Sequence, residues 1–201
     1  MIDGKVFVTR ELAPAVIQRL RTEFREVDVW EPYEPPTRAE LAEHAAGCVA
    51  LLTMVSDRID EELLDAAPTL KVVANMAVGY NNVDVIAAAA RGILITNTPN
   101  VLEETTADLA FALMLAVARR VVESDGDTRA GNWGLWHPSL WLGNDVHGAT
   151  LGIVGLGSIG SAVARRAKGF DMQIKYTARN RRHDSEVDVG AEFVPSLYDM
   201  L

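Results

Sequence analysis

Three glycines, Gly155, Gly157 and Gly160, follow the short apolar run 151–154 in the pattern G-x-G-x-x-G. In such a turn the first glycine permits a tight reversal and the second lets the backbone approach a pyrophosphate, while the third lets the following helix pack closely on its strand. The unpaired N–H groups at the start of that helix attract an anion without a charged side chain. The pattern predicts a dinucleotide-binding turn, and a purely structural glycine turn is the alternative.

The basic segment after the next apolar run indicates which dinucleotide this turn would hold. A fold that selects NAD places an acidic residue about 20 positions beyond the glycines, where it accepts a hydrogen bond from the ribose 2′-hydroxyl. Here Asp171 precedes the run and Asp184 lies beyond the turn, so neither is well placed. Guanidinium groups pair readily with phosphates. We therefore expect NADP in preference to NAD, held by Arg179, Asn180 and Arg181, unless these residues form only a solvated basic turn.

Composition excludes several other classes of function. The 201 residues are 49% hydrophobic and carry a formal net charge of −9, which argues against a broad nucleic-acid-binding surface. Cys48 is the only cysteine, so an intrachain disulfide and a multi-cysteine metal site are excluded, and its apolar surroundings predict burial. The most hydrophobic run, 109–118, is too short to span a membrane. With no secretory signal visible, a cytoplasmic location is expected.

Short apolar strands and amphipathic helices alternate through the first 98 residues. Alternation of this kind predicts a parallel sheet covered by helices on both faces, and five strands complete a small doubly wound domain. The expected strands are 5–9, 26–30, 48–54, 71–78 and 93–97, and the expected helices are 13–23, 38–46, 61–67 and 83–91.

A long apolar helix is expected next, capped by Asn100 with Glu103 three residues later, and continuing through Arg120. It is apolar nearly all round, which predicts burial on most faces. An irregular, tryptophan-rich segment, 131–143, follows it. Residues 149–201 then hold the glycine turn and the start of a second sheet, from which we expect two strands with one edge unpaired.

The order of these parts resembles the D-isomer-specific 2-hydroxyacid dehydrogenases, and within them the glyoxylate/hydroxypyruvate reductases. The matching segments are 77–84, 97–110, the pair Arg119 and Arg120, 136–143, and the glycine motif. The resemblance implies an α/β protein with a flavodoxin-like parallel-sheet substrate domain, 1–98, followed by an incomplete Rossmann dinucleotide-binding domain, 99–201. Within the second domain it implies a helix and dimerisation arm, 101–148, and the first half of a Rossmann sheet, 149–201.

The resemblance also implies an activity and its binding residues. Family members transfer a hydride between NAD(P)(H) and a small 2-oxo or 2-hydroxy acid such as glyoxylate or hydroxypyruvate. In that pattern Val78 and Gly79 offer backbone N–H groups to the substrate carboxylate, and Ser158 and Ile159 meet the cofactor pyrophosphate. The position where relatives place the acid that selects NAD corresponds to Ala178. A simple strand-to-helix turn is the alternative interpretation of Val78 and Gly79.

No catalytic residue can be assigned within the 201 residues. The catalytic His, acid and Arg of the family come from later segments, and none of His44, His137, His147 and His183 occupies the catalytic position. We interpret His44 and His147 as surface residues. His137 lies beside tryptophans, whose expected role is packing, with substrate contact as the alternative.

These observations predict a fragment that is inactive alone and that belongs to a homodimer when complete. No nucleic-acid, membrane or metal partner is expected. The alternative from a different class is a non-catalytic dinucleotide-binding or regulatory remnant of the same family.

Overall fold

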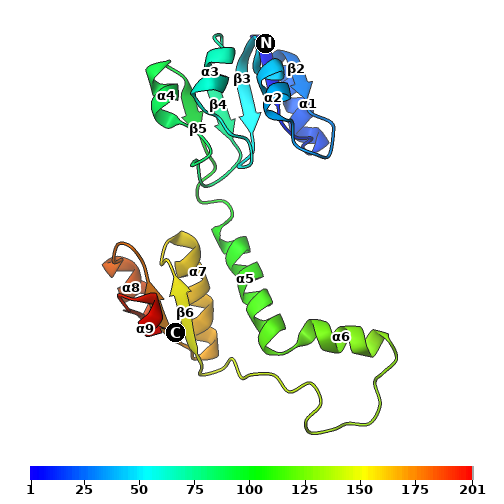
Figure 1. The fold of residues 1–201 in the computed structure, drawn as a ribbon, viewed down its shortest axis with the longest axis vertical. Coiled ribbons are helices and arrows are strands. Elements are labelled where there is room, and N and C mark those ends of the chain that lie inside the picture. Colours follow the sequence, from blue (N-terminus) through cyan, green and yellow to red (C-terminus); the bar gives the residue numbers. More distant parts are fainter. Residues whose placement is uncertain (201) are drawn as a thin grey trace. The chain divides into compact units, whose positions relative to one another are not determined.

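The computed structural model describes residues 1–200, and the chain divides into two α/β units, Met1–Val101 and the part from Leu102 onward (Figure 1). Each unit is built around its own parallel sheet. No helix of the described residues combines the length and the apolar character that crossing a membrane requires.

The first unit is a five-stranded parallel sheet with the order β2-β1-β3-β4-β5, which is the flavodoxin-like order expected from the sequence. Its elements are β1 (Ile2–Val8), α1 (Pro14–Glu23), β2 (Phe24–Val29), α2 (Arg38–Ala45), β3 (Cys48–Thr53), α3 (Glu61–Ala66), β4 (Val72–Asn75), α4 (Val85–Ala90) and β5 (Leu94–Thr96).

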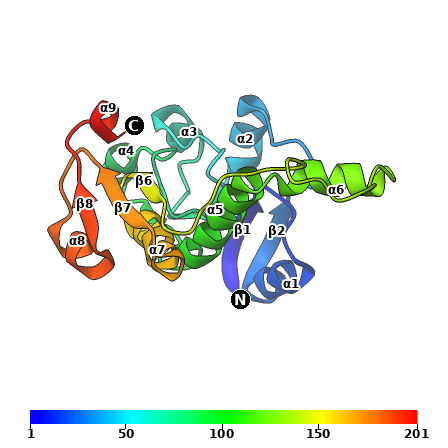
Figure 2. The ribbon, with the colours of Figure 1, turned by 90° about the horizontal axis from the view of Figure 1, so that it is seen from below.

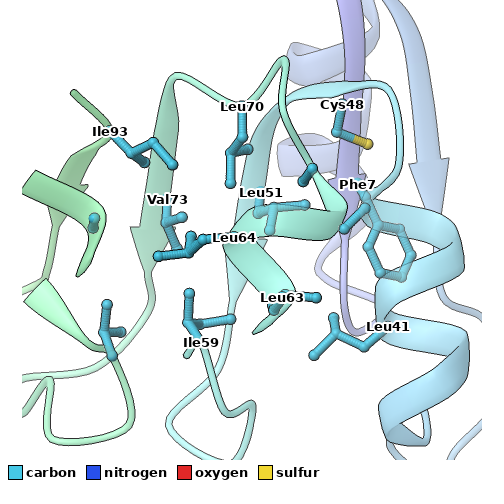
Figure 3. Packing of buried hydrophobic residues seen from close by; sticks show 14 of the residues in the cluster. Phe7, Leu41, Cys48, Leu51, Ile59, Leu63, Leu64, Leu70, Val73 and Ile93 are labelled. Carbon is cyan, nitrogen blue, oxygen red and sulfur yellow. The ribbon is translucent and has the colours of Figure 1, made fainter. Parts of the chain in front are cut away.

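The core of this unit lies between the central strands and the helices that cover one face of the sheet. Phe7, Leu51 and Val73 project from three neighbouring strands and meet Leu63 and Leu64 of α3, and all five side chains are buried (Figure 3). Side chains along a strand alternate between the two faces of the sheet, so every second residue enters this core. The buried faces of the helices fill the other side of the core. The packing fixes the strands in register and brings the carboxyl ends of β3, β4 and β5 to one edge.

The second unit contains a three-stranded parallel sheet with the order β6-β7-β8, which is one half of a Rossmann sheet. Helix α5 packs against α7 in this unit, as the view from below shows (Figure 2). Its elements are α5 (Glu103–Ala118), α6 (Val121–Arg129), β6 (Thr150–Val154), α7 (Ser158–Ala167), the 3-10 turn η1 (Lys168–Phe170), β7 (Gln173–Thr177), α8 (His183–Val189), β8 (Ala191–Phe193) and α9 (Leu197–Met200).

The expectation of two strands in this sheet is wrong, because β8 adds a third strand beside β7. Gly190 ends α8 with a left-handed φ of 70° and turns the chain directly into β8. A strand of three residues is too short to show an alternating pattern, which is why the sequence did not reveal it.

Helix α5 differs from expectation in its start, its end and its burial. Leu102, rather than Asn100, occupies the N-cap position, and Asn100 adopts a left-handed φ of 60°. The helix ends at Ala118, and a left-handed φ of 53° at Arg120 starts the separate helix α6, which the sequence analysis did not predict. Only one face of α5 packs on the sheet and α7. Within the described residues the opposite face is open, so burial on most faces is not observed.

Candidate functional site

The three glycines of the turn between β6 and α7 have different surroundings. Gly155 has φ +95° and donates its N–H to the Thr177 carbonyl at 2.8 Å, which joins the ends of β6 and β7. A Cβ at Gly160 would stand 2.2 Å from the Gly155 carbonyl oxygen, so only glycine lets the helix come this close. A Cβ at Gly157 would meet nothing within 4 Å. The space above Gly157 is therefore open to a ligand.

The helix that follows the turn begins inside the glycine motif. Helix α7 starts at Ser158, and the Ser161 N–H donates to the Gly157 carbonyl at 2.8 Å as its first helical bond. The N–H groups of Ser158, Ile159 and Gly160 precede that bond and have no helical acceptor. These donors and the positive end of the helix dipole are suited to attract an anion into the open space at Gly157.

A cavity of about 550 Å³ extends from this turn to the basic segment after β7. Arg179, Asn180 and Arg182 line it, and no carboxylate does. Among the described residues the guanidinium groups of Arg179 and Arg182 form no ion pair, so their charges are not neutralised by a neighbour. The remaining lining residues are Val154, Gly155, Leu156, Gly157, Thr177, Ala178 and Pro195.

Arg181, which the sequence analysis placed in the same cofactor site, does not line this cavity. Its Nε and Nη2 donate to the two carboxylate oxygens of Glu186 at 2.8 and 2.9 Å. The Arg181 guanidinium and then the Tyr176 hydroxyl lower the pKa of Glu186 from its ordinary 4.5 to about 2. The basic turn thus contains one neutralised arginine flanked by two that face the cavity.

The expected carboxylate site, Val78 and Gly79, lies in the first unit just after β4, which ends at Asn75 rather than continuing to Val78. Neither N–H donates a hydrogen bond to another group of the described residues. Two hydrogen bonds orient the peptide planes that carry them. The Thr98 N–H donates to the Ala77 carbonyl at 2.9 Å, and Asn97 Nδ2 donates to the Val78 carbonyl at 2.8 Å.

These bonds decide where the free donors point. All peptide bonds between the described residues are trans, so each N–H points opposite to the carbonyl of the same peptide plane. Because the Ala77 and Val78 carbonyls face residues 97 and 98, the N–H groups of Val78 and Gly79 face away from them. Two adjacent backbone donors with a shared direction form a small anion site that suits a carboxylate.

A buried amide network holds the loop that presents these donors. Asn75, which is 1% exposed, donates from Nδ2 to the Gly79 carbonyl at 3.1 Å, and Thr53 Oγ1 donates to Asn75 Oδ1 at 3.2 Å. Asn82 Nδ2 donates to the Asp57 carbonyl at 2.9 Å, which ties the loop to the segment that follows β3. Asn75, Asn82 and Asn97 were not among the residues expected at the site. Asn75 ends β4 and Asn97 follows β5, and these strand-end positions were the available signal.

Three histidines lie outside the two candidate binding sites: His44, His137 and His147. His44 is half-buried rather than free at the surface: its ring stacks on Phe7 at 4.8 Å between centroids, and its Nδ1 lies 2.8 Å from the Asp28 carboxylate. His137 Nδ1 is 2.7 Å from the Ser139 hydroxyl, whereas His147 is exposed as expected.

The single cysteine is buried as predicted. Cys48 has no exposed surface, and burial raises the pKa of its thiol to about 11. A thiol that stays protonated at neutral pH is a poor nucleophile.

Comparison with known proteins places the chain in one family. Residues 6–186 match the model of the D-isomer specific 2-hydroxyacid dehydrogenase catalytic domain. The chain is 52% identical over 192 residues to a glyoxylate reductase of Korarchaeum cryptofilum, covering 95% of this chain and 58% of that relative. It is 51% identical over 201 residues to a glyoxylate reductase of Thermococcus kodakarensis, covering 98% of this chain and 60% of that relative.

A solved structure agrees with the sequence comparisons. A Thermus thermophilus protein superposes with a TM-score of 0.88 and 46% identity, covering 98% of this chain and 61% of that one. The chain thus spans about three fifths of the length of the relatives it matches.

Proposed function

Because the chain belongs to the D-isomer specific 2-hydroxyacid dehydrogenase family, we propose that it serves hydride transfer between NADP(H) and a small 2-oxo or 2-hydroxy acid. Glyoxylate and hydroxypyruvate are the proposed substrates, in line with the glyoxylate reductases it resembles. The observation that carries the proposal is the cavity beside Gly157, which holds two unpaired guanidinium groups and no carboxylate.

The cofactor side of the proposal rests on the second unit. NADP, when bound, supplies or accepts the hydride at its nicotinamide ring. The N–H groups of Ser158 and Ile159 at the start of α7 fit a pyrophosphate, and Gly157 leaves room for it. Arg179 and Arg182 fit a ribose 2′-phosphate, since a carboxylate that would repel it is missing from the cavity.

The substrate side rests on Val78 and Gly79. Their N–H groups are oriented by Asn97 and Thr98 and are free to bind the carboxylate of a 2-oxo acid. The amide network around Asn75 fixes this loop before any substrate arrives, so little ordering cost falls on binding.

We further propose that the 201 residues do not complete the catalytic machinery. A proton donor near the carbonyl oxygen of the substrate is required, yet His44 is committed to Asp28 and stacks on Phe7. We also propose a homodimer formed through the helix and arm of residues 101–148, supported by the open apolar face of α5.

Purified 201-residue protein would be assayed for NADPH oxidation with glyoxylate and with hydroxypyruvate, alongside NADPH binding by fluorescence. We expect NADPH binding without turnover. Turnover on the order of 1 s⁻¹ or more would contradict the proposal that the 201 residues do not complete the catalytic machinery. The gene sequence beyond codon 201 separates the dehydrogenase from a non-catalytic remnant. A continuation with an Arg, an acid and a His supports the enzyme, and a stop codon supports the remnant.

A further inference from the structure

One buried tyrosine connects the basic turn to the helix that follows it. Tyr176, at the end of β7, has no exposed surface. Its hydroxyl donates to the Glu186 carboxylate of α8 and accepts the backbone N–H of Arg182 at 2.9 Å. A single hydroxyl therefore holds both the turn and α8, and the Arg182 backbone cannot move without breaking this bond.

A second connection runs through Arg181. Its guanidinium makes a two-pronged contact with Glu186, whose side chain is only 11% exposed, and lies 5.3 Å from the centre of the Phe193 ring. Two-pronged pairs of this kind are geometrically specific as well as strong. Arg181 is consequently oriented toward α8 and β8, while its neighbours on either side face the cavity.

Glu186 is the group that both connections share. We propose that Glu186 is a positioning residue for the 2′-phosphate subsite: by holding Arg181 and Tyr176 it fixes the turn from which Arg179 and Arg182 reach the cavity. This inference rests on the proposed function, because it assumes that the cavity takes a 2′-phosphorylated adenosine. The ligand class is thus a nucleotide with a phosphate on the ribose 2′-oxygen.

Simple electrostatics and positioning predict opposite effects of neutralising Glu186. Glu186→Gln removes a negative charge beside the basic turn and frees the charge of Arg181, which by electrostatics alone would tighten phosphate binding. If Glu186 positions the turn, the same variant loosens it, and the nucleotide must then order the turn as it binds. Positioning therefore predicts weaker binding despite the more positive site.

Calorimetry on the 201-residue chain with adenosine 2′,5′-bisphosphate and with 5′-AMP separates these effects. For Glu186→Gln we expect a loss of about tenfold for the bisphosphate and less than about twofold for 5′-AMP. Asp184→Asn is the matched control, because it removes the same charge from an exposed position on α8. That variant should bind both nucleotides like the wild type.

Tyr176→Phe is the second variant, since it keeps the ring that packs beside Phe193 and removes only the hydroxyl. It should show the same selective loss, which keeps the inference testable if Glu186→Gln folds poorly. Tighter bisphosphate binding by Glu186→Gln would overturn the positioning role. Equal losses for both nucleotides would also overturn it, by assigning Glu186 a purely structural role. A wild-type chain that binds neither nucleotide would refute the proposed function and this inference with it.

Discussion

At the scale of single residues, the glycine turn contains one position closed by the protein and one left open for a ligand. The Gly160 hydrogen that a methyl would replace points at the Gly155 carbonyl, whereas Gly157 faces empty space. We therefore expect Gly160 to matter for folding and Gly157 to matter for the proposed cofactor binding.

Gly160→Ala and Gly157→Ala form a matched pair that tests this difference. Gly160→Ala should lower the free energy of unfolding by roughly 1–3 kcal/mol, because the methyl overlaps a backbone oxygen that cannot move aside. Gly157→Ala should melt like the wild type but lose NADPH affinity, because its methyl occupies the space proposed for the pyrophosphate. Thermal melts and NADPH titrations of both variants check this. Normal NADPH binding by Gly157→Ala would place the pyrophosphate elsewhere.

Arg182 is the arginine that the structure adds to the expected cofactor site. Arg182→Ala and Arg179→Ala should each weaken NADPH binding by about ten- to a hundredfold while changing NADH binding little, since each removes a charge-assisted hydrogen bond to the 2′-phosphate. Ala178→Asp should shift preference in the same direction by repelling that phosphate. Arg129→Ala, which removes an exposed arginine of α6 that pairs with Asp125, is the control. Equal losses for both cofactors would show that these arginines support only the fold.

The lowered pKa of the Glu186 carboxylate predicts that the free energy of unfolding depends on pH. Its pKa in the folded protein, about 2, lies below the ordinary 4.5, so its contribution is fully present above pH 4.5 and is lost as the pH falls through 2. Wild type should be more stable than Glu186→Gln at neutral pH, and the difference should disappear toward pH 2. Urea unfolding of both proteins across this range measures it. A difference that does not change with pH would mean that the ion pair with Arg181 is not formed in solution.

At the scale of elements, the sequence predicted strands and helices well where each had its own periodicity and cap. Helix α2 is an example, because Thr37 and Glu40 form the reciprocal capping box that marks its start. Short elements were not predicted, because they lack a periodicity and a cap of their own. Strand β8 and helix α8 are defined by the Gly190 turn and by contacts with β7, which no local pattern reveals.

The open face of α5 leads to a prediction about assembly. Leu109, Leu113 and Val117 lie one turn apart and are 61%, 57% and 79% exposed, which leaves an apolar stripe without cover among the described residues. If the proposed homodimer uses this helix, Leu113→Glu should convert the protein to monomers in sedimentation velocity. Val187→Glu, at an exposed apolar residue of α8, is the control and should not change the assembly. A dimer that survives Leu113→Glu would place the interface elsewhere.

At the scale of the whole molecule, the proposed function assigns the carboxylate site to the first unit and the cofactor cavity to the second. The sequence predicts both sites, because Gly79 and the glycine motif each follow an apolar strand, and both sites remain predictions. It could not predict which side chains support them. The hydrogen bond from Asn97 to the Val78 carbonyl joins residues that become neighbours only after folding. Arg181 and Glu186 are close in the sequence, but their pairing depends on the turn between β7 and α8.

The proposed selection of NADP is the central claim and has a direct measurement. Titration calorimetry would compare NADPH with NADH on the unmodified 201-residue chain at low salt. Two unpaired guanidinium groups and no carboxylate in the cavity predict that NADPH binds about ten- to a hundredfold more tightly. The preference should shrink as salt is added, because exposed charges are screened. Equal affinities, or tighter binding of NADH, would contradict the account.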